Sequence, residues 1–140
     1  MELQIIFQLF LATVLGGLVG LEREIKKREA GLQTYSLVCL GSCIFSIFAF
    51  SFQSFTPLQI DLLRVIQAVA IGIGFIGAGT IFKSERGVEG LTTAAGLWVV
   101  AGIGIAIGAK FYILALLSTF FALIILAGLG LLEERFFPRK

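Results

Sequence analysis

Histidine is absent from this chain of 140 residues, and charged residues make up only 14% of it. Without histidine, a zinc site that combines Cys and His ligands is excluded, and a catalytic triad lacks its usual base. The net charge of +2 comes from scattered basic residues, whereas a nucleic-acid-binding surface needs them concentrated on one face. We therefore expect no enzymatic activity, no cofactor and no nucleic-acid partner.

Apolar residues dominate instead, because hydrophobic types account for 58% of the chain and the mean hydropathy is +1.01. They fall in five blocks, and a helix needs roughly 20 such residues to cross a hydrocarbon core of about 30 Å. The sequence thus predicts an all-α integral membrane protein, a bundle of five transmembrane helices that forms a single domain over residues 1–140. The expected helices are residues 3–21, 35–55, 58–82, 91–109 and 111–132.

The first apolar block lies where a signal peptide would lie. It lacks a basic segment in front, however, and ends in Glu22-Arg23-Glu24 rather than at small residues. We expect it to remain as a permanent helix. Cys39 and Cys43 lie four residues apart within the second block, a spacing that predicts one buried helical face.

The basic residues predict the orientation of the helices, because short cytoplasmic loops carry an excess of Lys and Arg. With the N-terminus outside and the C-terminus in the cytoplasm, nine of the 11 basic residues lie on the inner side. They are Arg23, Lys26, Lys27, Arg28, Lys83, Arg86, Arg135, Arg139 and Lys140, while Arg64 and Lys110 lie on the outer side. The reverse orientation would place nearly all of this charge on the wrong side.

Glycine occurs 17 times, largely inside the apolar blocks, where small residues let helix backbones approach closely in lipid. The pairs Gly16/Gly20 and Gly104/Gly108 have the spacing of a helix contact face, so the first and fourth helices should be central, although such pairs also arise by chance. The third block holds a further group, Gly72, Gly74, Gly77 and Gly79. This run matches G-x-G-x-x-G, but the dinucleotide motif needs a preceding strand and a solvated helix. We interpret it as a close-packed or bent helix segment.

A weak internal repeat relates two predicted helix starts. Gly20 and the segment Gly31-Leu32-Gln33-Thr34 match Gly79 and Gly90-Leu91-Thr92-Thr93 at a constant offset. Duplication would make them parallel repeats about an axis along the membrane normal. The alternative is that helices which begin after a glycine turn often use Thr as a cap, which would give the same likeness. In either case Gly90, Thr92 and Thr93 mark the start of the fourth helix.

Ionisable side chains within membrane helices are costly, which makes those of the third block candidates for function. Asp61, Arg64 and Gln67 share one helical face, which continues toward Gly74 and Ala78. One interpretation is a polar face buried against other helices. The other is an Asp–Arg pair at the outer interface, with the Arg64 side chain extended to the headgroups.

A charged cluster is expected on the cytoplasmic side, where the end of the first helix and the loop after the third could pair. Its members are Glu22, Arg23, Glu24, Lys83, Glu85 and Arg86. Such charges could equally be solvated and neutralise one another. For a metal ion the sequence offers only Asp61, Glu22 and Glu24 as weak candidate ligands, fewer than the octahedral shell of magnesium requires.

Four stretches of the chain resemble the MgtC/SapB family of bacterial inner-membrane proteins. They are GGLVGLERE at 16–24, AGLQT at 30–34, GIGFIGAGTI at 72–81 and GLTTAAGLW at 90–98. The resemblance covers nearly the whole chain and implies a five-helix, multi-pass protein of the cytoplasmic membrane with its C-terminus inside. It also implies a role in adaptation to magnesium limitation and, in pathogens, in survival within host cells.

By this resemblance such proteins act as modulators, with the proton-translocating ATP synthase and phosphate uptake among their proposed targets. Longer members continue into a cytoplasmic domain, whereas this chain ends at Lys140, so we expect its helices and short loops to carry the function. The leading hypothesis is a regulatory membrane protein that docks onto partners helix against helix, and that forms a homo-oligomer, most often a dimer. The alternative is a transporter for magnesium or another small ion, whose oxygen ligands an oligomer would assemble.

Overall fold

The computed structural model describes residues 2–53, 62–85, 87–130 and 136. Its elements in order are α1 (Glu2–Ile25), α2 (Leu32–Gln53), α3 (Leu62–Ala78), β1 (Phe82–Ser84), β2 (Gly87–Glu89), α4 (Leu91–Gly108), α5 (Tyr112–Leu123) and the π-helix η1 (Ile124–Leu129). Helices account for most of the described chain. The predicted all-α class is therefore confirmed, with the addition of a two-stranded hairpin.

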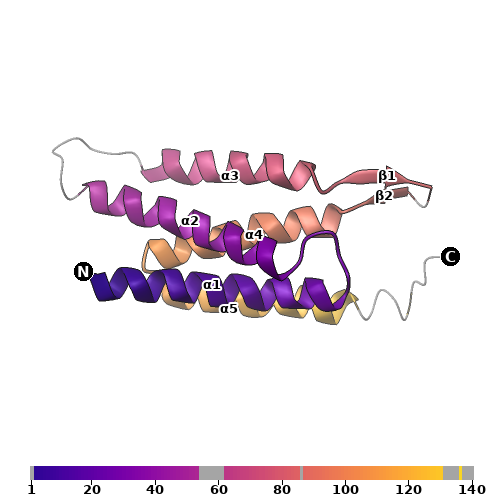
Figure 1. Cartoon of the computed structure of the whole chain (residues 1–140), viewed down its shortest axis with the longest axis horizontal. Helices are drawn as coiled ribbons and strands as arrows, with labels where there is room; N and C mark the ends of the chain where they lie inside the picture. The colour runs from indigo at the N-terminus through magenta and orange to yellow at the C-terminus, as the bar shows by residue number, and fades with distance from the viewer. Residues whose placement is uncertain (1, 54–61, 86, 131–135, 137–140) are drawn as a thin grey trace.

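The helices run alternately in opposite directions, so each is antiparallel to its neighbour in the chain (Figure 1). α4 contacts α1, α2, α3 and α5 and is the central helix of the described bundle. α3 lies along one edge, and α5 lies along the other edge next to α1 (Figure 1). The tight turn at Lys110, where φ is 68°, sends α5 back along α4.

Both ends of the connection between α1 and α2 differ from the prediction. α1 continues past residue 21 to Ile25, and α2 begins at Leu32 rather than at residue 35. The charged segment Glu22-Arg23-Glu24, which was predicted to close the first helix, therefore lies inside it. The apolar pattern misplaced these ends because a helix continues into the polar layer as long as its charged side chains find partners there.

The third helix ends earlier than predicted, at Ala78 rather than at residue 82. The Thr80 hydroxyl donates a hydrogen bond to the carbonyl oxygen of Gly77 at 2.8 Å, and such side-chain bonds to the backbone compete with helix continuation. The predicted loop at 83–90 is instead the antiparallel β1–β2 hairpin. Gly87 and Gly90 have φ values of 117° and 86°, which glycine adopts readily.

Four of the described helices are long and apolar enough to cross a membrane. They are Glu2–Ile25, Leu32–Phe52, Leu91–Gly108 and Tyr112–Leu129. The apolar part of α3, Leu63–Ala78, is shorter, and its predicted start at residue 58 lies outside the described residues. Large apolar side chains cover the outside of the bundle, as at Phe75 and Ile113, which are 83% and 75% exposed. A surface of this kind is suited to lipid rather than to water.

The glycine pair of α1 lies at its contact with α2. A Cβ atom on Gly16 would lie 2.6 Å from the Cβ of Cys39, and one on Gly20 would lie 2.8 Å from the Cα of Leu32. Real Cβ atoms do not approach other atoms this closely. Only glycine therefore allows the two backbones to approach so closely.

The glycine pair of α4 meets α2 as well. A Cβ atom on Gly104 would overlap the carbonyl oxygen of Cys39, and one on Gly108 would lie 2.7 Å from the carbonyl oxygen of Cys43. Both cysteines are fully buried, which confirms the predicted buried face. Ser46 extends this contact, because its hydroxyl donates to the carbonyl oxygen of Ile105 in α4 at 3.0 Å.

The glycines of α3 lie in other surroundings. Gly77 packs against α4, where a Cβ atom on it would lie 3.3 Å from the Cβ of Ala94. A Cβ atom on Gly72 or Gly74 would meet no described atom of another element within 4 Å. The predicted packing role of these two glycines is therefore not met within one copy of the chain, because their sides of α3 point away from α4. Gly79 lies in the turn after the helix.

Gly104→Ala and Gly102→Ala form a matched pair of substitutions in α4. The methyl group added at Gly104 would overlap α2, whereas a Cβ atom on Gly102 would have open space around it. We expect Gly104→Ala to lower the free energy of unfolding by about 1–3 kcal/mol, and Gly102→Ala to change it by less than about 1 kcal/mol, in the stabilising direction. Thermal unfolding in mild detergent measures both, and equal losses would contradict a close α2–α4 contact.

Candidate functional site

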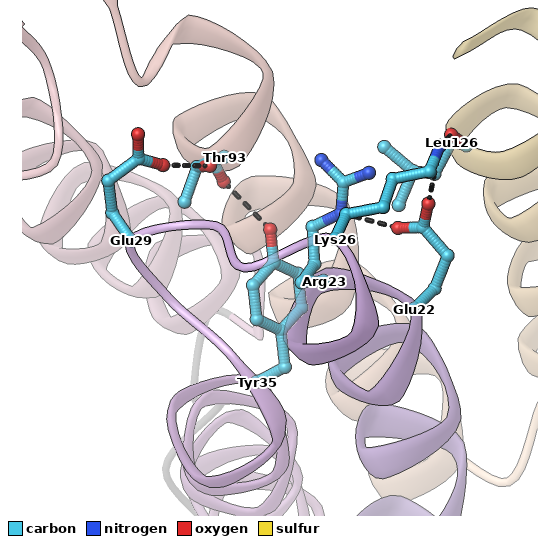
Figure 2. A network of polar contacts seen from close by, with 7 residues as sticks. All are labelled: Glu22, Arg23, Lys26, Glu29, Tyr35, Thr93 and Leu126. Atoms are coloured by element: carbon cyan, nitrogen blue, oxygen red, sulfur yellow. Dashed lines mark hydrogen bonds and ion pairs between the residues drawn. The ribbon is translucent and has the colours of Figure 1, made fainter. Parts of the chain in front are cut away.

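At one end of the bundle α1 leads into α2, the hairpin leads into α4, and η1 ends (Figure 1). Polar side chains of these segments contact one another there. We call the group drawn in Figure 2 the polar network. Its members are Glu22, Arg23, Lys26, Glu29, Tyr35, Thr93 and Leu126, the last through its carbonyl group.

One half of the polar network holds the end of α1 against η1. Arg23 is 2% exposed, and its Nε donates to Oε2 of Glu22 at 2.5 Å. Lys26 Nζ lies 2.9 Å from the other carboxylate oxygen of Glu22 and donates to the carbonyl oxygen of Leu126 at 2.7 Å. A Cβ atom on Gly130 would lie 2.8 Å from this Nζ, so glycine leaves room for the lysine. Two cations thus share one carboxylate beside a π-helix, an element that is often found at functional sites.

The other half of the polar network joins α2, α4 and the loop after α1. Tyr35 is fully buried, and its hydroxyl donates to the carbonyl oxygen of Thr93 at 3.0 Å. The Thr93 hydroxyl in turn donates to Oε2 of Glu29 at 2.8 Å. The backbone N–H of Glu29 and then the Thr93 hydroxyl hold the pKa of this carboxyl below its usual value of 4.5. A Cβ atom on Gly96 would lie 2.5 Å from the Tyr35 hydroxyl oxygen, so glycine is needed there as well.

Glu24 accepts a hydrogen bond from the first residue of α2. One of its carboxylate oxygens accepts a hydrogen bond from the backbone N–H of Leu32 at 3.1 Å. A negative charge at this position is favoured by the helix dipole and satisfies one of the N–H groups that a helix start leaves open. A Cβ atom on Gly31 would overlap the same carboxylate. The connection from α1 to α2 is therefore held by a side chain of α1 itself.

The predicted pairing between the two parts of the charged cluster is wrong for the residues that the structure describes. Glu22 pairs with Arg23 and Lys26 of its own helix, and Lys83 and Glu85 are exposed on the hairpin. Arg86 lies outside the described residues. The hairpin extends beyond the helix ends, which carries its charges away from the end of α1 (Figure 1).

The candidate metal ligands are not brought together either. No three Asp, Glu, His or Cys side chains cluster so as to hold a metal ion in the part of the chain that the structure describes. Glu22 and Glu24 face donors of the chain itself, as given above, and Asp61 lies outside the described residues. The other members of the predicted polar face, Arg64 and Gln67, are exposed on α3. Burial of this face against other helices is therefore wrong for a single copy.

The helix-start motif marks the start of α4, as predicted, but a threonine does not cap it. Gly90 is the N-cap of α4, and the cap has no side-chain hydrogen bond. Thr92 is exposed, while Thr93 is buried and bonds to Glu29. A Cβ atom on Gly90 would overlap the carbonyl oxygen of Thr80, so the glycine locks the start of α4 to the end of α3. Capping by Thr is therefore not the cause of the likeness between the two helix starts.

Sequence reasoning missed a buried amide near the opposite end of the bundle. Gln8 of α1 is 2% exposed, and its Nε2 donates to the carbonyl oxygens of Ile107 and Gly108 at 2.7 and 3.0 Å. These are the last two carbonyls of α4, and that of Ile107 also accepts from the backbone N–H of Lys110 at 2.9 Å. The position of Gln8 inside an apolar block was the feature of the sequence that could have indicated a buried hydrogen bond.

The sequence matches the profile of the MgtC family over residues 9–135. The chain belongs to the MgtC family. The matched region includes every member of the polar network. No solved structure matches the chain.

Curated relatives of the family include three that cover most of this chain. SrpB of Synechococcus elongatus is 40% identical over an alignment of 139 positions. The alignment covers 91% of this chain and 76% of SrpB. SapB of Bacillus subtilis is 41% identical, with 86% of this chain and 54% of SapB covered. YhiD of Escherichia coli K12, whose name proposes that it is a magnesium transporter, is 37% identical, with 90% of this chain and 60% of YhiD covered. The chain thus spans little more than half the length of SapB and YhiD.

A double-mutant cycle tests the placement of Tyr35 in this MgtC-family chain. Gly96→Ala should lower the free energy of unfolding by about 1–3 kcal/mol, because the new methyl group meets the Tyr35 hydroxyl. Tyr35→Phe removes that oxygen together with its hydrogen bond, at a cost of about 1 kcal/mol. The double variant should lose less than the sum of the two, since the clashing atom is gone. Thermal unfolding of the four proteins in detergent measures the cycle, and additive losses would contradict the contact.

Proposed function

We propose that the chain is a multi-pass protein of the bacterial cytoplasmic membrane in which all five helices span, with the N-terminus outside and the C-terminus in the cytoplasm. The distribution of basic residues in the fold supports this proposal. Arg23, Lys26 and Arg28 belong to the end of α1 and the connection to α2, and Lys83 belongs to the hairpin, while Lys110 lies in the turn between α4 and α5. The first two elements lie at one end of the bundle, and that turn lies at the other (Figure 1). Short cytoplasmic connections carry the excess of basic residues, so the first of these ends faces the cytoplasm.

Labelling of introduced cysteines in intact cells tests the five-span topology. The sites are Arg28 and Lys83 for the cytoplasmic side and Phe111 for the periplasmic side, all exposed. Lys27 and Lys110 are avoided because their positive φ values of 51° and 68° would strain a substituted residue. A membrane-impermeant maleimide should label only the cysteine at Phe111, with low background because Cys39 and Cys43 are buried. Labelling at Lys83 from outside would show that α3 does not span.

For the function itself, we propose a membrane regulatory protein in adaptation to magnesium limitation that acts through helix contacts with membrane partners. Membership of the MgtC family supports the link to magnesium, as does the name of the relative YhiD. The observation that supports the regulatory role is that the carboxylates at the end of the bundle with the polar network accept hydrogen bonds or pair with cations within the chain. Glu22, Glu24 and Glu29 each bond to a donor of the chain itself and hold the helices together. Among membrane partners, the family resemblance points to the proton-translocating ATP synthase.

The alternative is an oligomeric transporter for magnesium or another small ion, which the name of YhiD favours. Magnesium requires octahedral oxygen ligands with near-ideal geometry and retains several waters. In this chain a magnesium ion bound at the end with the polar network would have to displace the donors that now bond to the carboxylates of Glu22, Glu24 and Glu29. Transport therefore demands a rearrangement of the polar network, which regulation through helix contacts does not.

Reconstitution and growth together distinguish the two proposals. Liposomes that contain the purified protein and an enclosed magnesium-sensitive dye should take up Mg²⁺ no faster than empty liposomes, with an ionophore as the positive control. The same protein should restore growth at low magnesium in a bacterium that lacks its own MgtC-family protein. Saturable uptake by the wild-type protein that Glu22→Gln abolishes would overturn the regulatory role in favour of transport. Failure to restore growth would remove the link to magnesium.

A further inference from the structure

Arg23 carries a guanidinium whose two outer nitrogens have no partner in the described part of the chain. The residue is 2% exposed, and its Nε donates to Oε2 of Glu22. No hydrogen bond joins Nη1 or Nη2 to any residue that the structure describes. A buried cation with unpaired donors is unfavourable, so these two nitrogens need an occupant that supplies acceptors.

The guanidinium lies between the two halves of the polar network. Figure 2 shows it with the Thr93 side chain on one side and the bond from Lys26 to the Leu126 carbonyl on the other. Thr93 belongs to the first turn of α4, where the N-cap Gly90 provides no side-chain hydrogen bond to the N–H groups. The open N–H groups and the dipole of a helix start favour an anion. The buried guanidinium and the start of α4 therefore favour the same kind of ligand.

The charges around Arg23 also favour an anion. Arg23 and Lys26 share the one carboxylate of Glu22, which leaves a net positive charge in this half of the polar network. The carboxyl of Glu29 has its pKa lowered most by its own backbone N–H and then by the Thr93 hydroxyl, and least by Arg23. Glu29 therefore bonds to α4 and does not serve as the partner of the guanidinium.

We propose that a phosphate group binds to Nη1 and Nη2 of Arg23. The inference rests on the proposed topology, which places this end of the bundle at the cytoplasmic face, where lipid phosphates and free phosphate are both present. A guanidinium forms two parallel hydrogen bonds with a carboxylate or with a phosphate. A phosphate has further oxygens outside the plane of these bonds, and they can face the uncapped start of α4. A carboxylate has none, so the arrangement favours phosphate.

Binding to the purified wild-type protein is the first test. In a neutral detergent and a phosphate-free buffer, the protein should bind radiolabelled inorganic phosphate saturably in equilibrium dialysis. Its melting temperature should rise with phosphate concentration, because a ligand that binds only the folded state stabilises it. Sodium chloride at the same ionic strength is the control and should give a smaller rise.

Two substitutions of arginine distinguish a specific site from general attraction to basic residues. Arg23→Lys keeps a charge beside Glu22 but removes the paired Nη donors, so it should raise the dissociation constant for phosphate about tenfold or more. Arg28→Gln removes a positive charge from an exposed side chain at the same end and should change the constant by less than about threefold. Equal effects of the two would overturn the proposal.

A gain of affinity provides a test that does not depend on whether Arg23→Lys folds. Glu29→Gln keeps an oxygen for the Thr93 hydroxyl and removes a negative charge close enough for Arg23 to affect it. It should tighten phosphate binding by about threefold or more, because less repulsion opposes the anion. Glu85→Gln, an exposed change of the same kind on the hairpin, is the matched control and should have no effect. Unchanged affinity in Glu29→Gln would contradict a phosphate on Arg23.

Membranes of defined composition identify the source of the phosphate. If a lipid headgroup binds, native mass spectrometry should show wild-type protein, but not Arg23→Lys, retaining phosphatidylglycerol in preference to a galactolipid, which has no phosphate. If free phosphate binds, its dissociation constant should be the same in nanodiscs of either lipid. Saturable binding of neither form, or an acidic protein in place of phosphate on the protein purified from native membranes, would overturn the proposal. A wrong topology would show separately as labelling at Lys83 from outside, and phosphate binding in detergent does not depend on it.

Discussion

The close approach of α2 to both α1 and α4 is the constraint on which the rest of the structure depends. Helices in lipid gain little from hiding apolar surface, because the lipid tails are apolar too, so packing and hydrogen bonds must hold them together. Glycines at Gly16 and Gly104 bring the backbones on both sides within contact of Cys39. At this distance a short side chain such as Ser46 can reach a backbone carbonyl of the neighbouring helix, at 3.0 Å. With larger residues at the contacts, these bonds could not form.

The hydrogen bonds that this approach permits set the position of each helix along its neighbour. Apolar contacts alone tolerate a shift along the helix axis, whereas a buried hydroxyl or amide that loses its acceptor becomes unfavourable. Gln8 fixes α1 against the last carbonyls of α4 at one end of the bundle. Tyr35 fixes α2 against the first turn of α4 at the other end. α4 is thus held near both of its ends, by a different helix at each.

Much of this fold could be predicted from the sequence, because lipid imposes simple rules on helix length and backbone hydrogen bonding. The apolar blocks located the helices, and the glycine spacing located Gly16, Gly20, Gly104 and Gly108 at helix contacts. The partners of the polar side chains could not be predicted. Nothing in the spacing of Lys26 or Glu29 shows that one reaches a carbonyl in η1 and the other a threonine in α4, because both contacts depend on how distant segments pack. The sequence placed Thr93 at a helix start, with capping by threonine as one of two explanations, whereas its hydroxyl bonds to Glu29 and not to the start of α4.

α3 is joined to the polar network through the hairpin that follows it. Buried hydrogen bonds tie α1 and α2 to α4, and α3 packs on α4 where Gly77 lies against Ala94. The hairpin leads from the end of α3 to Gly90, which is locked against Thr80. Thr93 follows within the first turn of α4 and bonds to Glu29. A displacement of α3 would therefore displace the start of α4. The hydrogen bonds nearest to that point are the one from the Tyr35 hydroxyl to the Thr93 carbonyl and the one from the Thr93 hydroxyl to Glu29.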